Sequence, residues 1–332
     1  MPQTPVTVAI YAKAYDQVKP LLDEMGRDID LVLFDVDMQL TKDGATLEPE
    51  ATDIDYLWFS PEVSHDGNLG AAFDLALRVK SLDVLQTFNA GLDHPGYRQV
   101  ADRGTRICNS SAQSVAISEY ILGQVLAMFQ RHDEQRSAQK AGQWQRLPFR
   151  EIAGTNWLIV GFGPIGRATA ALAKAFGAHV TVVRRSPETG PTVDRAGTLA
   201  DLPHLLPNAD VIVLACPLNA ETRGLANRDF FANVKQGAVL VNIARGGIID
   251  DRALIEALDS DRLAAAALDV FHTEPLPAGD PLWQHPKIRL TAHTSFFGSG
   301  TRGRWYQLFL GNLPRYIAGE PLLNEFNPKD LV

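Results

Sequence analysis

The chain has 332 residues, of which 45% are hydrophobic and 21% are charged, and its formal net charge is −8. A negative balance argues against nucleic acid or an anionic membrane as a general partner, and no apolar run approaches the roughly 20 residues that a membrane-spanning helix requires. The N-terminus lacks the pattern of a secretory signal. Because Cys108 and Cys216 are the only cysteines, we expect reduced buried thiols, no metal site and a cytoplasmic protein.

Short apolar stretches alternate with helical segments in the first hundred residues. We expect helices over 16–25 and 69–80, with strands at 6–10, 31–34, 54–59 and 84–88. This alternation predicts a parallel sheet with helices on both faces. The first part of the chain is therefore expected to form a small doubly wound domain without a glycine fingerprint of its own.

The length of the chain favours a second domain. One long helix is predicted over 114–141, where apolar side chains recur at helical spacing and could bridge two domains. This helix makes a homodimer our default expectation. A helix over 302–318 could return the chain to the first domain. We predict one domain of residues 1–110 and 294–332, and a second domain of residues 111–293.

The second domain is organised around a glycine-rich turn, Gly161-Phe162-Gly163-Pro164-Ile165-Gly166. A strand over 156–160 precedes the turn, a helix-forming segment follows it, and another strand spans 179–183. The first glycine permits a tight turn, the second lets the backbone approach a pyrophosphate, and the third lets helix and strand pack closely. The helix N-terminus attracts the phosphates. We interpret the turn as a dinucleotide site rather than an ordinary loop. Further strands are expected at 211–215, 238–244, 265–270 and 288–292, which completes a six-stranded parallel sheet.

The residues after the second strand of this unit bear on the choice of cofactor. An NAD enzyme of this kind usually has Asp or Glu there, which accepts hydrogen bonds from the ribose hydroxyls. This chain instead has Arg184, Arg185 and Ser186. Two guanidinium groups can clamp a 2′-phosphate that an acid would repel. We therefore expect NADPH to be preferred over NADH. The alternative is that both arginines are solvated loop residues.

Three polar side chains follow apolar strands closely, namely Arg245, Glu274 and His293. Since ligands of open parallel sheets bind outside the carboxyl ends of the strands, we expect all three at one edge. The set suits reduction of a carbonyl by hydride: the imidazole is the acid, the carboxylate favours the imidazolium, and the arginine binds an anionic substrate. The alternatives are a surface ion pair and a loop histidine. His272 is the second choice for the acid, whereas His285 precedes its strand and should lie at the wrong edge.

With these motifs, the sequence resembles the D-isomer-specific 2-hydroxyacid dehydrogenases over nearly its whole length. The resemblance is carried by residues 241–247 (VNIARGG), 268–277 (LDVFHTEPLP) and 291–293 (TAH). It implies a flavodoxin-like substrate domain and a Rossmann cofactor domain. It also implies that Arg245 binds and orients a 2-oxo acid, and that Glu274 pairs with His293, the acid/base.

The resemblance implies further binding residues. The substrate carboxylate is received by the loop of Asn89, Ala90, Gly91 and Leu92, and the nicotinamide carboxamide is held by Asp269. Other cofactor contacts are implied at Cys216, Pro217, Thr222, Ala244, Arg245 and His293. Two residues depart from the family pattern, since Ala292 replaces a usual proline and Asn89 replaces a usual glycine.

Within the family, residues 281–286 (PLWQHP) together with Trp58 are most similar to the short glyoxylate/hydroxypyruvate reductases. Trp58 is expected at the substrate, or alternatively in the core. The resemblance predicts NADPH-dependent reduction of small 2-oxo acids to D-2-hydroxy acids. One alternative is an NAD-dependent dehydrogenase of larger 2-oxo acids such as phenylpyruvate. Another is a dinucleotide-sensing binding protein, which would not need an intact Arg–Glu–His set.

Overall fold

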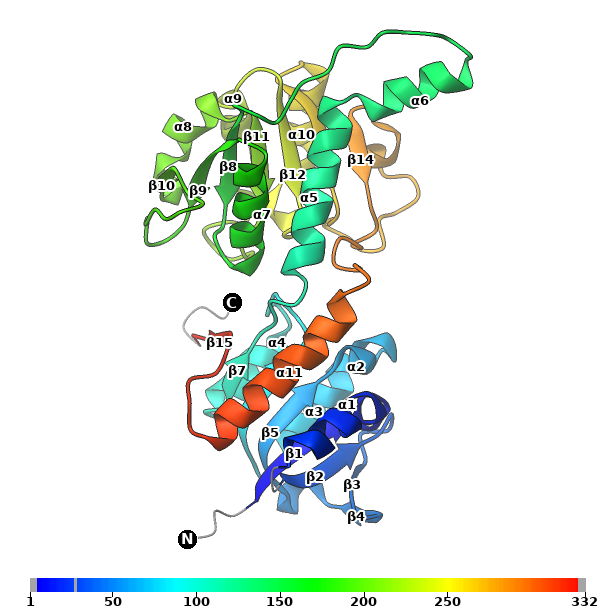
Figure 1. Ribbon diagram of the computed structural model, residues 1–332, viewed down its shortest axis with the longest axis vertical. Coiled ribbons are helices and arrows are strands. Elements are labelled where there is room, and N and C mark those ends of the chain that lie inside the picture. Colours follow the sequence, from blue (N-terminus) through cyan, green and yellow to red (C-terminus); the bar gives the residue numbers. More distant parts are fainter. Residues whose placement is uncertain (1–4, 27–28, 328–332) are drawn as a thin grey trace. The chain divides into compact units, whose positions relative to one another are not determined.

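The structure is a computed structural model that describes residues 5–26 and 29–327. The chain divides into two compact units, unit 1 (Met1–Gln113 and Ser299–Val332) and unit 2 (Ser114–Gly298), and Figure 1 traces the chain through both. The predicted boundaries at residues 110 and 294 differ from these by three and five residues. Residues 1–4, on which the prediction of no secretory signal depends, lie outside the described residues.

Unit 1 contains an eight-stranded sheet in the order β15-β7-β6-β5-β1-β2-β3-β4. Its parallel strands are β1 (Val6–Tyr11), β2 (Ile29–Phe34), β5 (Asp53–Phe59), β6 (Ser81–Thr87) and β7 (Arg106–Cys108). The order β2-β1-β5-β6-β7 is that of a flavodoxin-like fold, which confirms the predicted class.

Three short antiparallel strands were not predicted for unit 1. They are β3 (Leu40–Lys42) and β4 (Ala45–Leu47), which form a hairpin beside β2, and β15 (Glu325–Phe326), which pairs with β7. Strands of two or three residues are too short to show a period. The hairpin nevertheless carries a local signal, because Asp43 and Gly44 at its turn both have positive φ, as a two-residue Asp-Gly turn requires.

Helices cover the sheet of unit 1 in Figure 1, and α11 runs beside α1. They are α1 (Ala12–Met25), α2 (Pro61–His65), α3 (Leu69–Arg78), α4 (Pro95–Asp102) and α11 (Thr301–Ile317). Because α11 belongs to unit 1 by its contacts, the predicted return of the chain to the first domain is confirmed.

Unit 2 contains a seven-stranded sheet in which every strand pair is parallel. In spatial order, its strands are β10 (Arg195–Gly197), β9 (His179–Val183), β8 (Asn156–Val160), β11 (Val211–Leu214), β12 (Ala238–Asn242), β13 (Leu263–Leu268) and β14 (Ile288–Leu290). The prediction of six strands was wrong because it missed the edge strand β10, which has three residues. The strand order reverses between β8 and β11, and ligands of such sheets bind at this point.

The two faces of this sheet bury different side chains. Leu158 and Val160 of β8 belong to one apolar cluster, and Trp157 and Ile159 belong to another. This alternation follows from the two-residue period of a strand. Both faces are therefore covered, as the long apolar stretches in the sequence predict.

The helix predicted over 114–141 is in fact two helices, α5 (Ser114–Phe129) and α6 (His132–Lys140). Between them, Arg131 has a left-handed conformation with φ 55°, which ends the helical path. Apolar side chains of α5 are buried beside α7 (Pro164–Ala175), whereas α6 is almost wholly polar and exposed. No core therefore holds α6 in line with α5. Because α5 lies within unit 2, it does not bridge two domains.

The remaining helices of unit 2 lie on both sides of its sheet (Figure 1). They are α7 (Pro164–Ala175), α8 (Leu202–Leu205), α9 (Arg228–Ala232) and α10 (Asp251–Asp259). Throughout the described part of the chain, no helix combines the length and apolar character needed to cross a bilayer.

Candidate active site

The glycine-rich turn between β8 and α7 is shaped by close backbone contacts. Gly161 has φ 104°, and a Cβ there would lie 2.4 Å from the carbonyl oxygen of Ala215. A Cβ at Gly166 would lie 2.2 Å from the carbonyl oxygen of Gly161, whereas one at Gly163 would meet nothing within 4 Å. Gly163 is also the N-cap of α7. The turn is therefore open at Gly163, where the helix α7 begins. An open helix N-terminus fits the pyrophosphate of a dinucleotide.

Arg184 lies beside this turn. Its N–H donates to the carbonyl of Gly197 in β10 at 2.9 Å, and its guanidinium carbon lies 5.6 Å from the ring centroid of Phe162. That distance is within the range of a cation–π contact. Arg185 and Ser186 follow as exposed residues. The predicted phosphate-binding residues are thus near the glycine turn, at the end of β9.

The loop after β11 is braced by Thr222, one of the residues implied at the cofactor. The Thr222 hydroxyl donates to the carbonyl of Pro217 at 2.6 Å, and it accepts the N–H of Asn219 at 2.9 Å. Cys216 at the start of the loop is buried, and burial raises the pKa of its thiol to about 12. Ala244 follows β12 and is also buried. Cys108 and Cys216 are both free, as predicted.

His293 and Glu274 form a hydrogen-bonded pair. The His293 Nδ1 lies 2.7 Å from one carboxylate oxygen of Glu274, and the other oxygen accepts the N–H of Phe271 at 2.9 Å. The carboxylate is therefore fixed from two sides, and it requires a proton on Nδ1. The side chains of His293 and Glu274 are 40% and 37% exposed. The Nε2 of His293 is the nitrogen that this pairing leaves for a ligand.

Arg245 is brought to the same edge by a glycine. Arg245, Glu274 and His293 follow β12, β13 and β14, which are neighbours in the sheet. A Cβ at Gly246 would lie 2.0 Å from the carbonyl carbon of Phe271, so only glycine allows these two loops to pack. The half-buried Arg245 donates to the carbonyl of Ala244 at 2.6 Å.

Asp269 holds the loop that carries His293. The carboxylate is fully buried and accepts hydrogen bonds from the Thr291 hydroxyl at 2.6 Å, the Thr294 N–H at 2.9 Å and the Ser295 N–H at 3.0 Å. His293 lies between these donors with φ 52°, a conformation that costs a non-glycine residue on the order of 1–3 kcal/mol. Asp269 therefore stabilises a strained turn at the candidate acid, and the sequence reasoning missed this role. The sequence did carry a signal for it, namely an aspartate directly after an apolar strand.

The Thr291 hydroxyl also bonds to the hydroxyl of Tyr120 at 2.7 Å. Tyr120 belongs to α5, and burial raises the pKa of its phenol to about 12. The neutral phenol thus links α5 to the His293 loop through Thr291 and Asp269.

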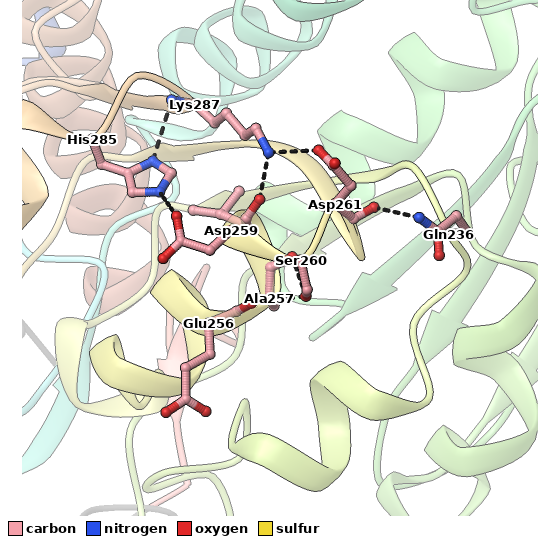
Figure 2. A network of polar contacts seen from close by, with 9 residues as sticks. Gln236, Glu256, Ala257, Asp259, Ser260, Asp261, His285 and Lys287 are labelled. Carbon is pink, nitrogen blue, oxygen red and sulfur yellow. Dashed lines mark hydrogen bonds and ion pairs between the residues drawn. The ribbon is translucent and has the colours of Figure 1, made fainter.

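The two competing histidines have hydrogen-bond partners of their own. His285 precedes β14, its Nε2 lies 3.3 Å from Asp259 at the end of α10, and its Nδ1 accepts the N–H of Lys287 at 3.2 Å (Figure 2). Lys287 also donates to Asp261 at 2.6 Å. This network joins α10 to the amino end of β14, which confirms that His285 lies at the other edge. His272 has its Nε2 2.8 Å from the carbonyl of Ile249.

In unit 1, the loop of Asn89, Ala90, Gly91 and Leu92 follows β6. Two of its backbone carbonyls accept hydrogen bonds. The carbonyl of Asn89 accepts the N–H of Ser110, and the carbonyl of Ala90 accepts the side-chain amide of Asn109, both at 2.8 Å. Among the hydrogen bonds of the described residues, none involves the N–H groups of residues 90–92. A loop with its N–H groups available fits the predicted binding of a carboxylate.

Trp58 is a core residue rather than a substrate contact. Its side chain is 1% exposed, and its ring stacks on Phe309 of α11 at 4.2 Å between centroids with a 2° interplanar angle. Tyr306 packs against it edge-on at 5.7 Å. Since these partners belong to the same unit, the structure corrects the substrate-binding prediction and supports the alternative of a core position.

A parallel sheet with a dinucleotide turn and an Arg–Glu–His set at its carboxyl edge defines an NAD(P)-dependent oxidoreductase. Similarity to known proteins narrows this class to one family. Residues 122–295 match the family model described as D-isomer specific 2-hydroxyacid dehydrogenase, NAD binding domain. The chain therefore belongs to the D-isomer specific 2-hydroxyacid dehydrogenases, as the resemblance predicted.

Several relatives carry named activities. A hydroxyphenylpyruvate reductase of Plectranthus scutellarioides is 30% identical over 262 residues, which cover 78% of this chain and 82% of that protein. Glyoxylate/hydroxypyruvate reductase A HPR2 of Arabidopsis thaliana is 30% identical over 263 residues, with coverages of 77% and 83%. The solved structure of an NADPH-dependent glyoxylate/hydroxypyruvate reductase of Sinorhizobium meliloti, in complex with NADP and sulfate, has a TM-score of 0.77 at 25% identity and covers 98% of this chain and 99% of that one.

Proposed function

We propose that the protein is a cytoplasmic, NADPH-dependent reductase of small 2-oxo acids such as glyoxylate and hydroxypyruvate, with D-2-hydroxy acids as products. The observation that carries the proposal is the His293–Glu274 pair at 2.7 Å, at the sheet edge where the glycine turn opens. The named activities of the Arabidopsis and Sinorhizobium relatives support the same substrate class.

The chain's residues divide the work of the reaction. A bound dinucleotide supplies a hydride to the carbonyl carbon of the 2-oxo acid. Arg245 pairs with the anionic substrate and polarises its carbonyl. His293 gives the proton on Nε2 to the developing alkoxide, and Glu274 stabilises the imidazolium before transfer. The N–H groups of residues 90–92 receive the substrate carboxylate.

The cofactor is held, in this proposal, by the glycine turn and by loops at the neighbouring strand ends. The backbone of residues 161–166 would hold the pyrophosphate, and Asp269 would accept a hydrogen bond from the nicotinamide carboxamide. NADPH is preferred because Arg184 and Arg185 replace the usual acid, and Arg184 is supported by the ring of Phe162. Further contacts come from Ser186, Cys216, Pro217, Thr222, Ala244, Arg245 and His293.

A second candidate is the reduction of larger 2-oxo acids such as phenylpyruvate. The ring of Phe296 packs edge-on to His293 at 5.9 Å, and Phe297 contacts Phe296 at 4.3 Å with 60% of its side chain exposed. This apolar surface beside the imidazole suits an aromatic substrate. The Plectranthus relative is named for such a substrate.

One absorbance assay separates these candidates. NADPH oxidation is followed with glyoxylate, hydroxypyruvate and phenylpyruvate, and kcat/KM is compared among the three. The proposal expects hydroxypyruvate and glyoxylate to have the higher values. A higher value for phenylpyruvate supports the second candidate, whereas dinucleotide binding without oxidation supports a sensor.

Replacing Glu274 by Gln is expected to move the high-pH limb of the pH–rate profile for reduction to lower pH. Reduction requires the protonated imidazole, and the neutral amide no longer stabilises its positive charge. Activity is therefore lost earlier as the pH rises. The measurement is kcat/KM between pH 5 and 9 for both proteins. An unchanged profile would show that the pair does not govern proton transfer.

We also propose a homodimer, built on the segment 141–150 that follows α6. Trp144 is 95% exposed and Phe149 is 56% exposed, and aromatic side chains are enriched where protein surfaces meet. Arg150 fixes the end of the segment, because it pairs with Asp210 and lies 4.5 Å above the ring of Phe129. Light scattering is expected to give twice the chain mass of 36.3 kDa, and Trp144→Ser should shift the mass toward the monomer. A monomeric wild type at micromolar concentration would contradict this.

A further inference from the structure

A closed cycle of hydrogen bonds lies beneath the loop that follows β6 in unit 1. The side-chain amide of Asn89 donates to the Tyr97 hydroxyl at 2.8 Å, and that hydroxyl lies 2.7 Å from the Thr87 hydroxyl. The backbone N–H of Asn89 donates to the Thr87 hydroxyl at 3.2 Å, which closes the cycle. Because the Tyr97 oxygen accepts from Asn89, its own proton is available for Thr87. Each member therefore has a partner, and the cycle fixes both the backbone and the side chain of Asn89.

Tyr97 is itself held rigidly. It is 1% exposed, and Phe73 of α3 packs against its ring edge-on at 4.7 Å. Phe73 also stacks on His94 at 4.5 Å, and a Cβ at Gly96 would lie 2.3 Å from the Phe73 ring. These contacts leave the α4 backbone little freedom to move. Burial raises the pKa of Tyr97 to about 12, so the hydroxyl stays protonated at neutral pH.

The same loop is held from its other side. Asn109 donates to the carbonyl of Ala90, and Ser110 donates to the carbonyl of Asn89, both at 2.8 Å. Both donors follow β7, whereas Tyr97 belongs to α4. Hydrogen bonds thus come from two elements and occupy the carbonyls and the Asn89 side chain. Within the described part of the chain, these bonds leave the N–H groups of residues 90–92 unused and fix the backbone that carries them.

We propose that Asn89 and Tyr97 are a pair of positioning residues, which hold the backbone of residues 90–92 ready for the carboxylate of the 2-oxo acid. The proposal rests on the proposed function, because it assigns the carboxylate to this loop. Neither Asn89 nor Tyr97 takes part in hydride transfer or proton transfer. Its effect should fall on the binding of the 2-oxo acid and not on the binding of the dinucleotide, which unit 2 is proposed to hold.

Two substitutions and one control test the pair. Tyr97→Phe removes only the hydroxyl, Asn89→Gly removes only the side chain, and the double variant combines them. Each single variant is expected to raise KM for hydroxypyruvate about three- to tenfold, the loss of about one hydrogen bond, with KM for NADPH and kcat within twofold. The double variant should be no worse than the single variants, because both remove the same bond.

Tyr56→Phe is the matched control. Tyr56 is another buried tyrosine of unit 1, and its hydroxyl bonds to Gln86 of β6. Gln86 and Thr87 are successive strand residues and point to opposite faces of the sheet. The control therefore removes a buried hydroxyl without touching the loop, and it should leave KM for hydroxypyruvate unchanged. Circular dichroism melting curves show whether each variant is folded.

Amide hydrogen exchange of residues 88–93 provides a readout independent of turnover. Exchange there is expected to be faster in Tyr97→Phe and Asn89→Gly, and unchanged in Tyr56→Phe. Unchanged exchange in both loop variants, or an equal rise of KM in Tyr56→Phe, would overturn the positioning role while leaving the reductase intact. A wild-type protein that reduces no 2-oxo acid would instead overturn the proposed function, and the substrate role of the pair with it.

Discussion

Replacing His293 by Ala is expected to lower kcat for 2-oxo acid reduction by roughly 10²–10⁴-fold, the usual contribution of a general acid. The imidazole is the group whose Nδ1 is engaged by Glu274 at 2.7 Å, and its Nε2 is oriented by the strained turn at φ 52°. Alanine provides neither the proton nor the orientation. KM for NADPH should change far less than kcat, because the glycine turn that is proposed to bind the pyrophosphate is intact.

His272→Ala is the control for this prediction. His272 is the nearest competitor in the sequence, and its ring is bonded to the carbonyl of Ile249. It should keep most of the wild-type turnover. Equal losses in the two variants would mean that the effect is structural, and loss in His272→Ala alone would assign the acid to His272.

Replacing Arg184 and Arg185 together by Ala is expected to raise KM for NADPH by about 10- to 100-fold, since the two charge-assisted hydrogen bonds proposed for the 2′-phosphate would be lost. KM for NADH should stay nearly unaltered, because that dinucleotide has no 2′-phosphate. Arg184 is the better placed of the two, with its guanidinium 5.6 Å from the ring of Phe162. Steady-state kinetics with both cofactors at saturating 2-oxo acid provides the comparison.

NADH is the internal control for that double variant. A general loss of folding would raise KM for both cofactors, whereas loss of the phosphate clamp affects NADPH alone. Equal efficiency of the wild-type protein with NADH and NADPH would show that both arginines are solvated loop residues.

Periodicity predicted the long buried elements well and the short exposed ones poorly. The parallel strands β1, β5 and β11 coincide closely with apolar stretches because both of their faces are buried. The hairpin β3–β4 and the edge strand β10 have three residues each, so no period can develop. The long helix was overpredicted for a related reason: apolar spacing ends with α5, and only helix-forming polar residues continue into α6.

The candidate site was predictable where topology alone determines position. Residues that follow neighbouring parallel strands must meet at one edge, and Arg245, Glu274 and His293 follow three such strands. The loop contacts were not predictable in this way. The approach of Gly246 to Phe271 and the three bonds to Asp269 depend on tertiary geometry, which one sequence does not reveal.

Trp58 illustrates the opposite limit. A tryptophan at the carboxyl end of a strand suits either a pocket wall or the core, and its local sequence is the same in both cases. The choice is made by Phe309, which is 251 residues away in the chain and stacks on its ring. Asn89 is similar, since its tether to Tyr97 depends on how α4 packs.

The proposed function is tested by the transfer of deuterium to hydroxypyruvate from NADPH that is labelled at both C4 positions of the nicotinamide ring. The product is analysed by mass spectrometry for label and by chiral chromatography for configuration. We expect D-glycerate with one deuterium on C2. An L product, an unlabelled C2, or bound NADPH that is not oxidised with any 2-oxo acid would contradict it.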